Sequence, residues 1–240
     1  MTRKRLLIIP ALILAALAVA GIVYVMTFHP PSDRYPVRGI DVSHHQGAID
    51  WTGVASDGIR FAWIKATEGG DFSDTRFTEN WRGAEAAGLL RSAYHFFTLC
   101  RPGTEQAAHF IATVPLDETA LPPAVDLEFT GNCAEKDHLP DIPGELAAFL
   151  ERIESHYGRT AVVYVRPDFY AAHLTGRNIR NPLWLQSFVR EPDYGERPWT
   201  FWQYHVFGQV RGIDVPVDRN VFRGTEADFT AWLESNGAIR

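Results

Sequence analysis

The sequence predicts an α/β fold, with a barrel or a doubly wound sheet as the architecture. Short apolar segments typical of buried strands alternate with segments of helical periodicity between residues 39 and 165. Such alternation is typical of parallel strands joined by helices. It stops after residue 188, where only about ten residues, including two prolines and a glycine, precede the next predicted strand. A parallel crossover normally needs about a dozen residues, so at least one late strand should run antiparallel.

The predicted strands are apolar runs bounded by turn residues. They cover residues 39–43, 61–66, 92–96, 124–129, 161–165, 184–188 and 200–205. Helices are predicted near residues 78–87, 104–113 and 144–157, and the last of these is followed by Gly158. A closing helix is predicted between the N-cap residue Thr225 and Gly237, with three buried side chains, Phe229, Trp232 and Leu233.

Acidic residues lie at the ends of predicted strands. Asp126 and Glu128 are two residues apart in an apolar run, so their side chains share one face of the strand. Burial of unpartnered carboxylates is costly, which argues against packing as the whole reason for the pair. Neighbouring acids push their pKa values apart, so one can hold a proton while the other is ionised, as glycoside hydrolysis requires. A structural pair satisfied by salt bridges is the alternative.

Asp41 is a third acid at a strand end, far from the other two in the sequence. Three acids in such positions predict a polar cup at the carboxyl end of a barrel. The composition, 46% hydrophobic and 22% charged, fits an ordinary globular domain. The net charge of −6, without a basic stripe, argues against nucleic-acid binding. Neither a cofactor nor a metal is expected, because the cysteines and nearby histidines lack the spacing of a metal site.

The acids belong to a series of motifs that resembles the glycoside hydrolase family 25 lysozymes, which are N-acetylmuramidases. The resemblance runs from about Tyr35 to the last helix, and its motifs lie at residues 39–43, 61–69, 94–96, 126–128, 184–185, 202–204 and 217–220. It implies a modified, TIM-like β/α barrel. The first strands would be parallel and followed by helices, and the last strands would be partly antiparallel and lack helices.

The resemblance also implies an activity, hydrolysis of the β-1,4 bond between N-acetylmuramic acid and N-acetylglucosamine in peptidoglycan glycan strands. A non-catalytic peptidoglycan-binding module and a hydrolase of another N-acetylated glycan, such as chitin, are the alternatives. All the matching acids are present, which favours an enzyme over a binding module. The sequence identifies no protein partner.

Carried over residue by residue, Glu128 matches the family's general acid, and Asp126 matches the acid that supports the reacting centre. Asp41 and Asp218 match two further active-site acids. A last strand is also expected at the motif of residues 217–220. Asp218 lies near its start, so a structural cap or salt bridge is its alternative role. Further candidates for substrate contact are the strand aromatics and one lysine, namely Tyr94, Tyr164, Trp184, Trp202 and Lys65. Core packing and a solvated ion pair are the alternatives for these.

The mechanism has three possible routes. Two carboxylate residues separated by one residue on a strand have Cα atoms roughly 6.6 Å apart. This distance does not distinguish a retaining pair of acids from an inverting pair. In the third route, the acetamido group of the substrate attacks its own anomeric carbon, and Asp126 orients and charge-balances the acetamido nitrogen. The third route is the preferred hypothesis.

The amino terminus predicts a membrane anchor. Basic residues at 3–5 precede an apolar run over residues 6–28, long enough for a transmembrane helix. The basic flank places the amino terminus in the cytoplasm and the catalytic domain in the periplasm or the cell exterior. Cleavage of a signal peptide after Ala20, giving a secreted protein, is the alternative. Residues 29–36 would form a linker and residues 37–237 the hydrolase domain.

The two cysteines, Cys100 and Cys133, lie on the expected exported side, each shortly after a predicted strand. If those strands are neighbours, loops that leave the same edge bring the sulfurs together. Oxidising compartments favour a disulfide, which is therefore predicted over two free thiols.

Overall fold

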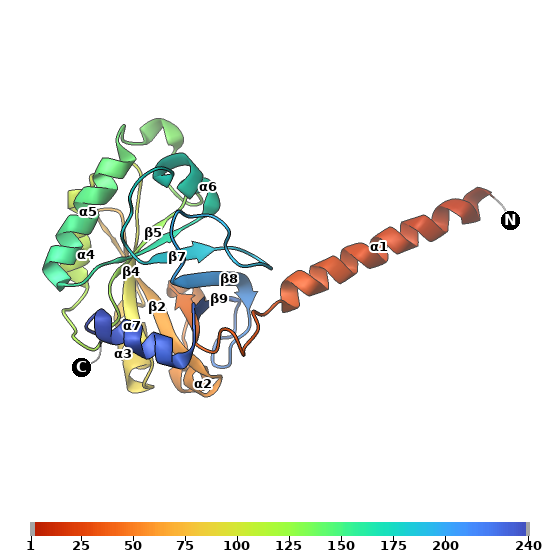
Figure 1. The fold of residues 1–240 in the computed structure, drawn as a ribbon, viewed down its shortest axis with the longest axis horizontal. Coiled ribbons are helices and arrows are strands. Elements are labelled where there is room, and N and C mark those ends of the chain that lie inside the picture. The colour runs from red at the N-terminus through yellow and green to blue at the C-terminus, as the bar shows by residue number, and fades with distance from the viewer. Residues whose placement is uncertain (1–2, 239–240) are drawn as a thin grey trace.

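The computed structural model describes the backbone of residues 3–238 and the side chains of residues 12–238. Within these residues, a nine-stranded sheet closes into a barrel because β1 pairs with both β2 and β9 (Figure 1). Its strands are β1 (Arg38–Val42), β2 (Ile59–Glu68), β3 (Phe72–Ser73), β4 (Leu90–Phe96), β5 (Ala124–Leu127), β6 (Val162–Val165), β7 (Leu183–Gln186), β8 (Phe201–Gly208) and β9 (Val217–Phe222). The short β3 lies outside the barrel as an antiparallel extension of β2. The predicted modified barrel is therefore confirmed.

Barrel neighbours are parallel from β1 through β8, and β9 is antiparallel to both of its neighbours. A reversed late strand was predicted, but the reason given for it was wrong. The connection from β7 to β8 is parallel, and it spans residues 187–200 because β7 ends at Gln186. The reversal comes one strand later, where the loop after Gly208 returns the chain into β9.

Helices follow the early strands and cover the outside of the barrel (Figure 1). They are α2 (Trp51–Ser56), α3 (Phe77–Ala86), α4 (Gly103–Thr113), α5 (Ile142–Tyr157), α6 (Pro167–Phe169) and α7 (Glu226–Ser235), with short helical turns at His44–Gln46, Glu135–Asp137 and Tyr170–Leu174. The Asp141 side chain caps α5, which ends at Gly158 with φ of 64°. Thr225 and Asp228 form a capping box at the start of α7. The predicted helices are confirmed, with ends shifted by one or two residues.

Aromatic side chains fill the interior of the barrel. Trp63 and Trp184 stack with ring centroids 5.1 Å apart, and Phe61 and Phe201 pack beside them. Phe229 of α7 joins this layer and is 1% exposed, as predicted for the closing helix. Because this part of the interior is apolar and packed, polar side chains gather at the carboxyl ends of the parallel strands.

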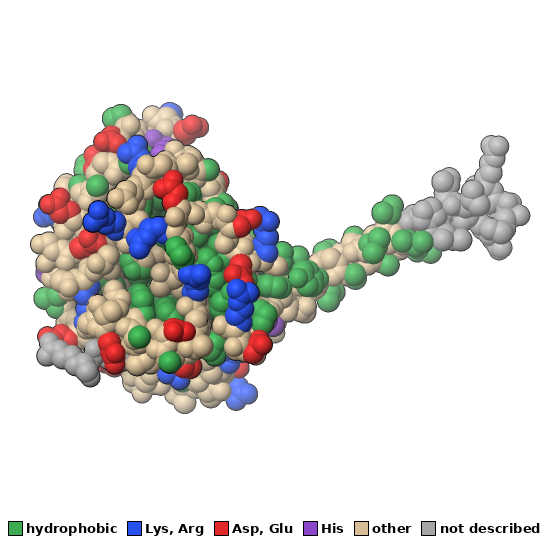
Figure 2. All heavy atoms as spheres, viewed as in Figure 1, with side chains coloured by type: hydrophobic (Ala, Val, Ile, Leu, Met, Phe, Trp, Pro, Cys, Tyr) green, Lys and Arg blue, Asp and Glu red, His purple; other side chains and the backbone are tan. Residues whose placement is uncertain are grey.

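The helix α1 (Arg3–Thr27) precedes the barrel and projects away from it (Figure 2). Its described side chains are largely exposed and apolar, from Leu12 at 64% exposed to Met26 at 52%. Among the residues that the structure describes in full, no helix is long and apolar enough to cross a membrane, so the predicted transmembrane helix is not supported. Those residues begin at position 12, which leaves less than the about 20 residues that a bilayer requires. The side chains of the basic flank at 3–5 lie outside the described residues.

Candidate active site

Two cavities lie at the carboxyl end of the barrel, and four acids line both of them. The Lys65 cavity, about 330 Å³, also contains Lys65, Glu68 and His45 in its wall. The Arg166 cavity, about 200 Å³, also contains Arg166 and Gln186. The acids common to both walls are Asp41, Asp126, Glu128 and Asp218. The structure thus brings together all four acids predicted for the site, in a wall between two cavities.

Asp218 reaches the site because β9 is reversed. The start of β9 lies beside the end of β1, where Asp218 is the direct register partner of Asp41. The two carboxyl groups share a hydrogen bond, and burial together with the charge of Asp41 raises the pKa of Asp218 well above its usual value. The raised pKa favours the protonated form of Asp218, which can donate the hydrogen bond to Asp41.

Asp41 accepts more hydrogen bonds than the other acids of the wall. Asn220 Nδ2 donates to its Oδ2 at 2.7 Å, and Gln203 Nε2 donates to its two oxygens at 3.1 and 3.2 Å. Burial raises the pKa of Asp41, and the bonds from Asn220, Gln203 and Asp218 oppose that rise. Asp41 is thus a buried carboxyl group whose oxygens already accept hydrogen bonds from neighbouring side chains.

Gln203 and Asn220 are further residues of the candidate site, and the sequence did not predict them. Gln203 is 3% exposed, and its Oε1 accepts from Tyr164 at 2.9 Å and from Gln186 at 3.0 Å. Trp184 Nε1 donates to Asn220 Oδ1 at 2.8 Å. A polar amide inside each of two largely buried strands was the available signal, since a buried amide needs partners.

Asp126 has the least satisfied carboxylate in the wall. Its side chain is buried, and its Oδ1 has no hydrogen-bond partner among the described residues. Burial raises the pKa of Asp126 well above its usual value, and the charges of Glu128 and Asp41 add to the rise. The Asp126 carboxyl group lines both cavities and makes few hydrogen bonds within the protein, so it is suited to receive a donor from a bound ligand.

Glu128 follows the last residue of β5 and pairs with Arg166. Arg166 Nη1 lies 3.1 Å from Glu128 Oε2, and the Glu128 side chain is 19% exposed. Burial raises the pKa of Glu128, while the hydrogen bond and charge of Arg166 lower it. Asn132 holds the backbone here, because its Nδ2 donates to the Glu128 carbonyl at 2.9 Å.

Three of the four predicted aromatic contacts lie at the site. Tyr94 lines both cavities, and Tyr164 and Trp184 line the Arg166 cavity. Trp202 does not reach either cavity. Its ring packs on the outer side of β8 against Phe28, because Gln203 is the neighbour that faces inward and strand side chains alternate.

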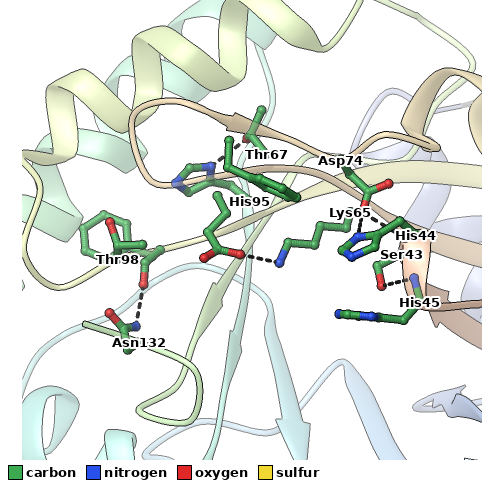
Figure 3. Close-up of polar contacts among 12 residues, drawn as sticks. Ser43, His44, His45, Lys65, Thr67, Asp74, His95, Thr98 and Asn132 are labelled. Carbon is green, nitrogen blue, oxygen red and sulfur yellow. Dashed lines mark hydrogen bonds and ion pairs between the residues drawn. The ribbon is translucent and has the colours of Figure 1, made fainter. Parts of the chain in front are cut away.

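Lys65 lies in the wall of the Lys65 cavity and contacts Glu68, which is not one of the four acids common to both cavities. Its Nζ is 2.7 Å from Glu68 Oε2 and 4.8 Å from the centroid of the Phe96 ring. Figure 3 shows Lys65 between two polar pairs, His44 with Asp74 and Thr67 with His95. Its side chain is 11% exposed, so the pair is more than a solvated surface contact.

The disulfide between Cys100 and Cys133 is confirmed, with Cα atoms 6.3 Å apart. It joins the loop after β4 to the loop after β5, two strands that are neighbours as expected. Asn132, which holds the Glu128 carbonyl, is adjacent to Cys133, so the disulfide lies in the loop that positions the acid. Within the described residues, no group of three or more His, Cys, Asp or Glu side chains could hold a metal ion.

A modified β/α barrel with several carboxylates at the carboxyl ends of its strands is an arrangement suited to glycoside hydrolysis. The chain belongs to the glycosyl hydrolases family 25, whose family model matches residues 40–213. It is 36% identical to Lysozyme M1 of Streptomyces globisporus, across 87% of this chain and 74% of that protein. The resemblance found in the sequence is thereby confirmed.

Solved structures agree with this assignment. A family 25 glycosyl hydrolase from Bacillus anthracis is 37% identical, covers 85% of this chain and 96% of its own, and superposes with a TM-score of 0.78. A bacterial lysozyme from Streptomyces coelicolor is 35% identical, covers 81% of this chain and 95% of its own, and has a TM-score of 0.75. The chain is therefore a glycoside hydrolase.

Proposed function

We propose that this enzyme is a muramidase that hydrolyses the β-1,4 bond between N-acetylmuramic acid and N-acetylglucosamine in peptidoglycan. The observation that supports it best is the wall of four acids between the Lys65 and Arg166 cavities. A glycan that occupies both cavities crosses this wall, so a glycosidic bond lies against the acids. The names of the related lysozymes support peptidoglycan as the polymer.

Glu128 is the general acid in this proposal and protonates the departing glycosidic oxygen. It lies at the edge of the wall and is more exposed than Asp126 or Asp41, so it can reach a bond above the wall. Burial raises its pKa, which favours the protonated form that a general acid needs.

Asp126 supports the reacting centre by holding the substrate's acetamido group. The N–H of that group donates to the Asp126 carboxylate, which lines both cavities, and this bond stabilises the ionised form of Asp126. The acetamido oxygen then attacks the anomeric carbon while Glu128 gives its proton to the leaving sugar. Asp41 is a poorer candidate for a base that activates water, because Asn220, Gln203 and Asp218 already occupy its oxygens.

Zymography on purified peptidoglycan, with chitin in a parallel gel, tests the function. We expect clearing of the peptidoglycan gel and little or none of the chitin gel. Clearing of chitin alone would assign the enzyme to another N-acetylated polymer. Binding to peptidoglycan without new reducing ends would contradict catalysis and support a non-catalytic binding module.

We also propose that the amino-terminal segment anchors the enzyme in a membrane, with the barrel in the periplasm or the cell exterior. The support is the basic flank before the apolar run in the sequence, together with the exposed apolar side chains on α1. Phe28 packs on Trp202 and Tyr204 at the end of that helix, which joins the segment to the barrel.

Cell fractionation is expected to recover the protein in the membrane fraction with residues 1–28 intact. The matched variant deletes residues 1–28 and carries a cleavable export signal, and it should become soluble with unchanged hydrolysis per molecule. Recovery of soluble wild-type protein that begins at Gly21 would instead establish cleavage after Ala20.

A further inference from the structure

Two cations at the site have different partners. Among the described residues, Lys65 and Arg166 are the lysine and the arginine that line the cavities. Lys65 is neutralised by Glu68, at 2.7 Å. Arg166 contacts Glu128 at 3.1 Å, so its charge acts directly on an acid of the wall, and its Nε lies 3.8 Å from Asp168 Oδ1 outside the wall.

The fold holds Arg166 in a fixed direction beside β5. Its backbone N–H donates to the Leu127 carbonyl at 3.4 Å, and Pro167 starts α6 immediately after it. The nitrogen that contacts Glu128 also donates to Thr130 Oγ1 at 3.0 Å. One guanidinium nitrogen therefore links Glu128 to Thr130, two residues further along the loop that carries the acid.

We propose that Arg166 is a positioning residue for the general acid, which fixes the direction of the Glu128 carboxylate and sets the upper limit of the enzyme's working pH. This inference rests on the proposed function, in which Glu128 donates the proton.

Opposing influences act on Glu128. Burial and the charges of Asp41 and Asp168 raise its pKa, and Arg166 lowers it. The titratable or charged groups that face it from the surrounding elements are Asp126 on β5, Asp41 on β1, Asp218 on β9, Tyr164 on β6, and Asp168 and Arg166 after β6. A general acid works while protonated, so activity falls as the pH rises through its pKa. Removal of Arg166 raises that pKa and extends activity to higher pH.

The experiment compares wild type, Arg166→Met and Arg166→Lys in kcat/KM over a pH series, with soluble peptidoglycan fragments as substrate. In Arg166→Met we expect the fall of kcat/KM on the alkaline side to occur at higher pH than in wild type. When each profile is scaled to its own maximum, every pH unit of displacement makes kcat/KM of the variant about tenfold higher than that of wild type on this side. At the optimum, kcat should fall roughly tenfold to a hundredfold, because the carboxylate loses its orientation. Arg166→Lys keeps the charge, so its limb should stay close to that of wild type.

Arg190→Met is the matched control, because Arg190 pairs with Asp193 on the surface and is 71% exposed. Its pH profile should coincide with that of wild type. Titration of the ¹³C-labelled Glu128 carboxylate by NMR, in wild type and Arg166→Met, measures the change in the pKa of Glu128 without substrate. If circular dichroism shows that the Met variant does not fold, Arg166→Gln replaces it, since Gln still has N–H donors for Thr130.

Coincident titrations of Glu128 in wild type and the Arg166 variant would overturn the inference. So would a loss of kcat/KM by the same factor at every pH, which is the result expected of a merely structural role. If the Glu128 titration moves as expected but wild type does not hydrolyse peptidoglycan, the coupling between Arg166 and Glu128 stands and the proposed function is wrong.

Discussion

Glu128→Gln is expected to lower kcat about a hundredfold to ten-thousandfold while the protein folds normally. The amide has nearly the same shape as the carboxyl group, but it has no proton to give to the departing oxygen. Its oxygen can still accept from Arg166, which lies 3.1 Å from Glu128 Oε2, so the loop should keep its position. Release of reducing ends from purified peptidoglycan measures the rate, and thermal unfolding followed by circular dichroism measures stability.

Glu79→Gln is a matched control for this variant. Glu79 pairs with Arg76 on the surface, its side chain is 60% exposed, and it lines neither cavity. Exposed ion pairs contribute little, so both activity and thermal stability should stay near the wild-type values. A Glu128→Gln enzyme that retained more than a few per cent of the wild-type rate would assign proton donation to another residue.

The strands and three of the acids could be predicted because local pattern decides them. Apolar runs between turn residues define β1 and β5, and carboxylates at their ends must lie at one edge of a parallel sheet. The position of Asp218 was harder to predict, because it depends on the direction of β9 in the sheet. The local sequence of a strand does not determine that direction. The connection before β8 misled the prediction because β7 ends at Gln186, earlier than its apolar run suggests.

The side-chain directions on β8 could have been predicted and were not. Strand alternation places Trp202 and Gln203 on opposite faces, and a buried amide belongs in a polar network, so Trp202 had to face outward. The contact of Arg166 with Glu128 could not have been predicted in this way, because a single arginine before a proline forms no recognisable sequence pattern. Its contact with Glu128 depends on the parallel pairing of β5 with β6, which only the folded structure provides.

Asp126→Asn is expected to lower kcat by roughly a hundredfold to a thousandfold, because a neutral amide cannot balance the positive charge that develops on the acetamido nitrogen. Burial raises the pKa of Asp126 in the free enzyme, so the ionised form depends on the substrate's N–H for stabilisation. The amide oxygen of Asn still accepts that hydrogen bond, and binding should therefore weaken less than turnover. Steady-state kinetics on peptidoglycan fragments separates the two effects as KM and kcat.

Asp193→Asn is the matched control, since Asp193 is 65% exposed and pairs with Arg190 on the surface, and its kcat should match wild type. The same mechanism predicts retention of configuration, because attack by the acetamido group and then by water inverts the anomeric carbon twice. Proton NMR of the first product, recorded before mutarotation, identifies the anomer. An inverted product would exclude the acetamido route. It would make Asp126 or Asp41 the base that activates water, and the hydrogen bonds that already occupy Asp41 favour Asp126 for that role.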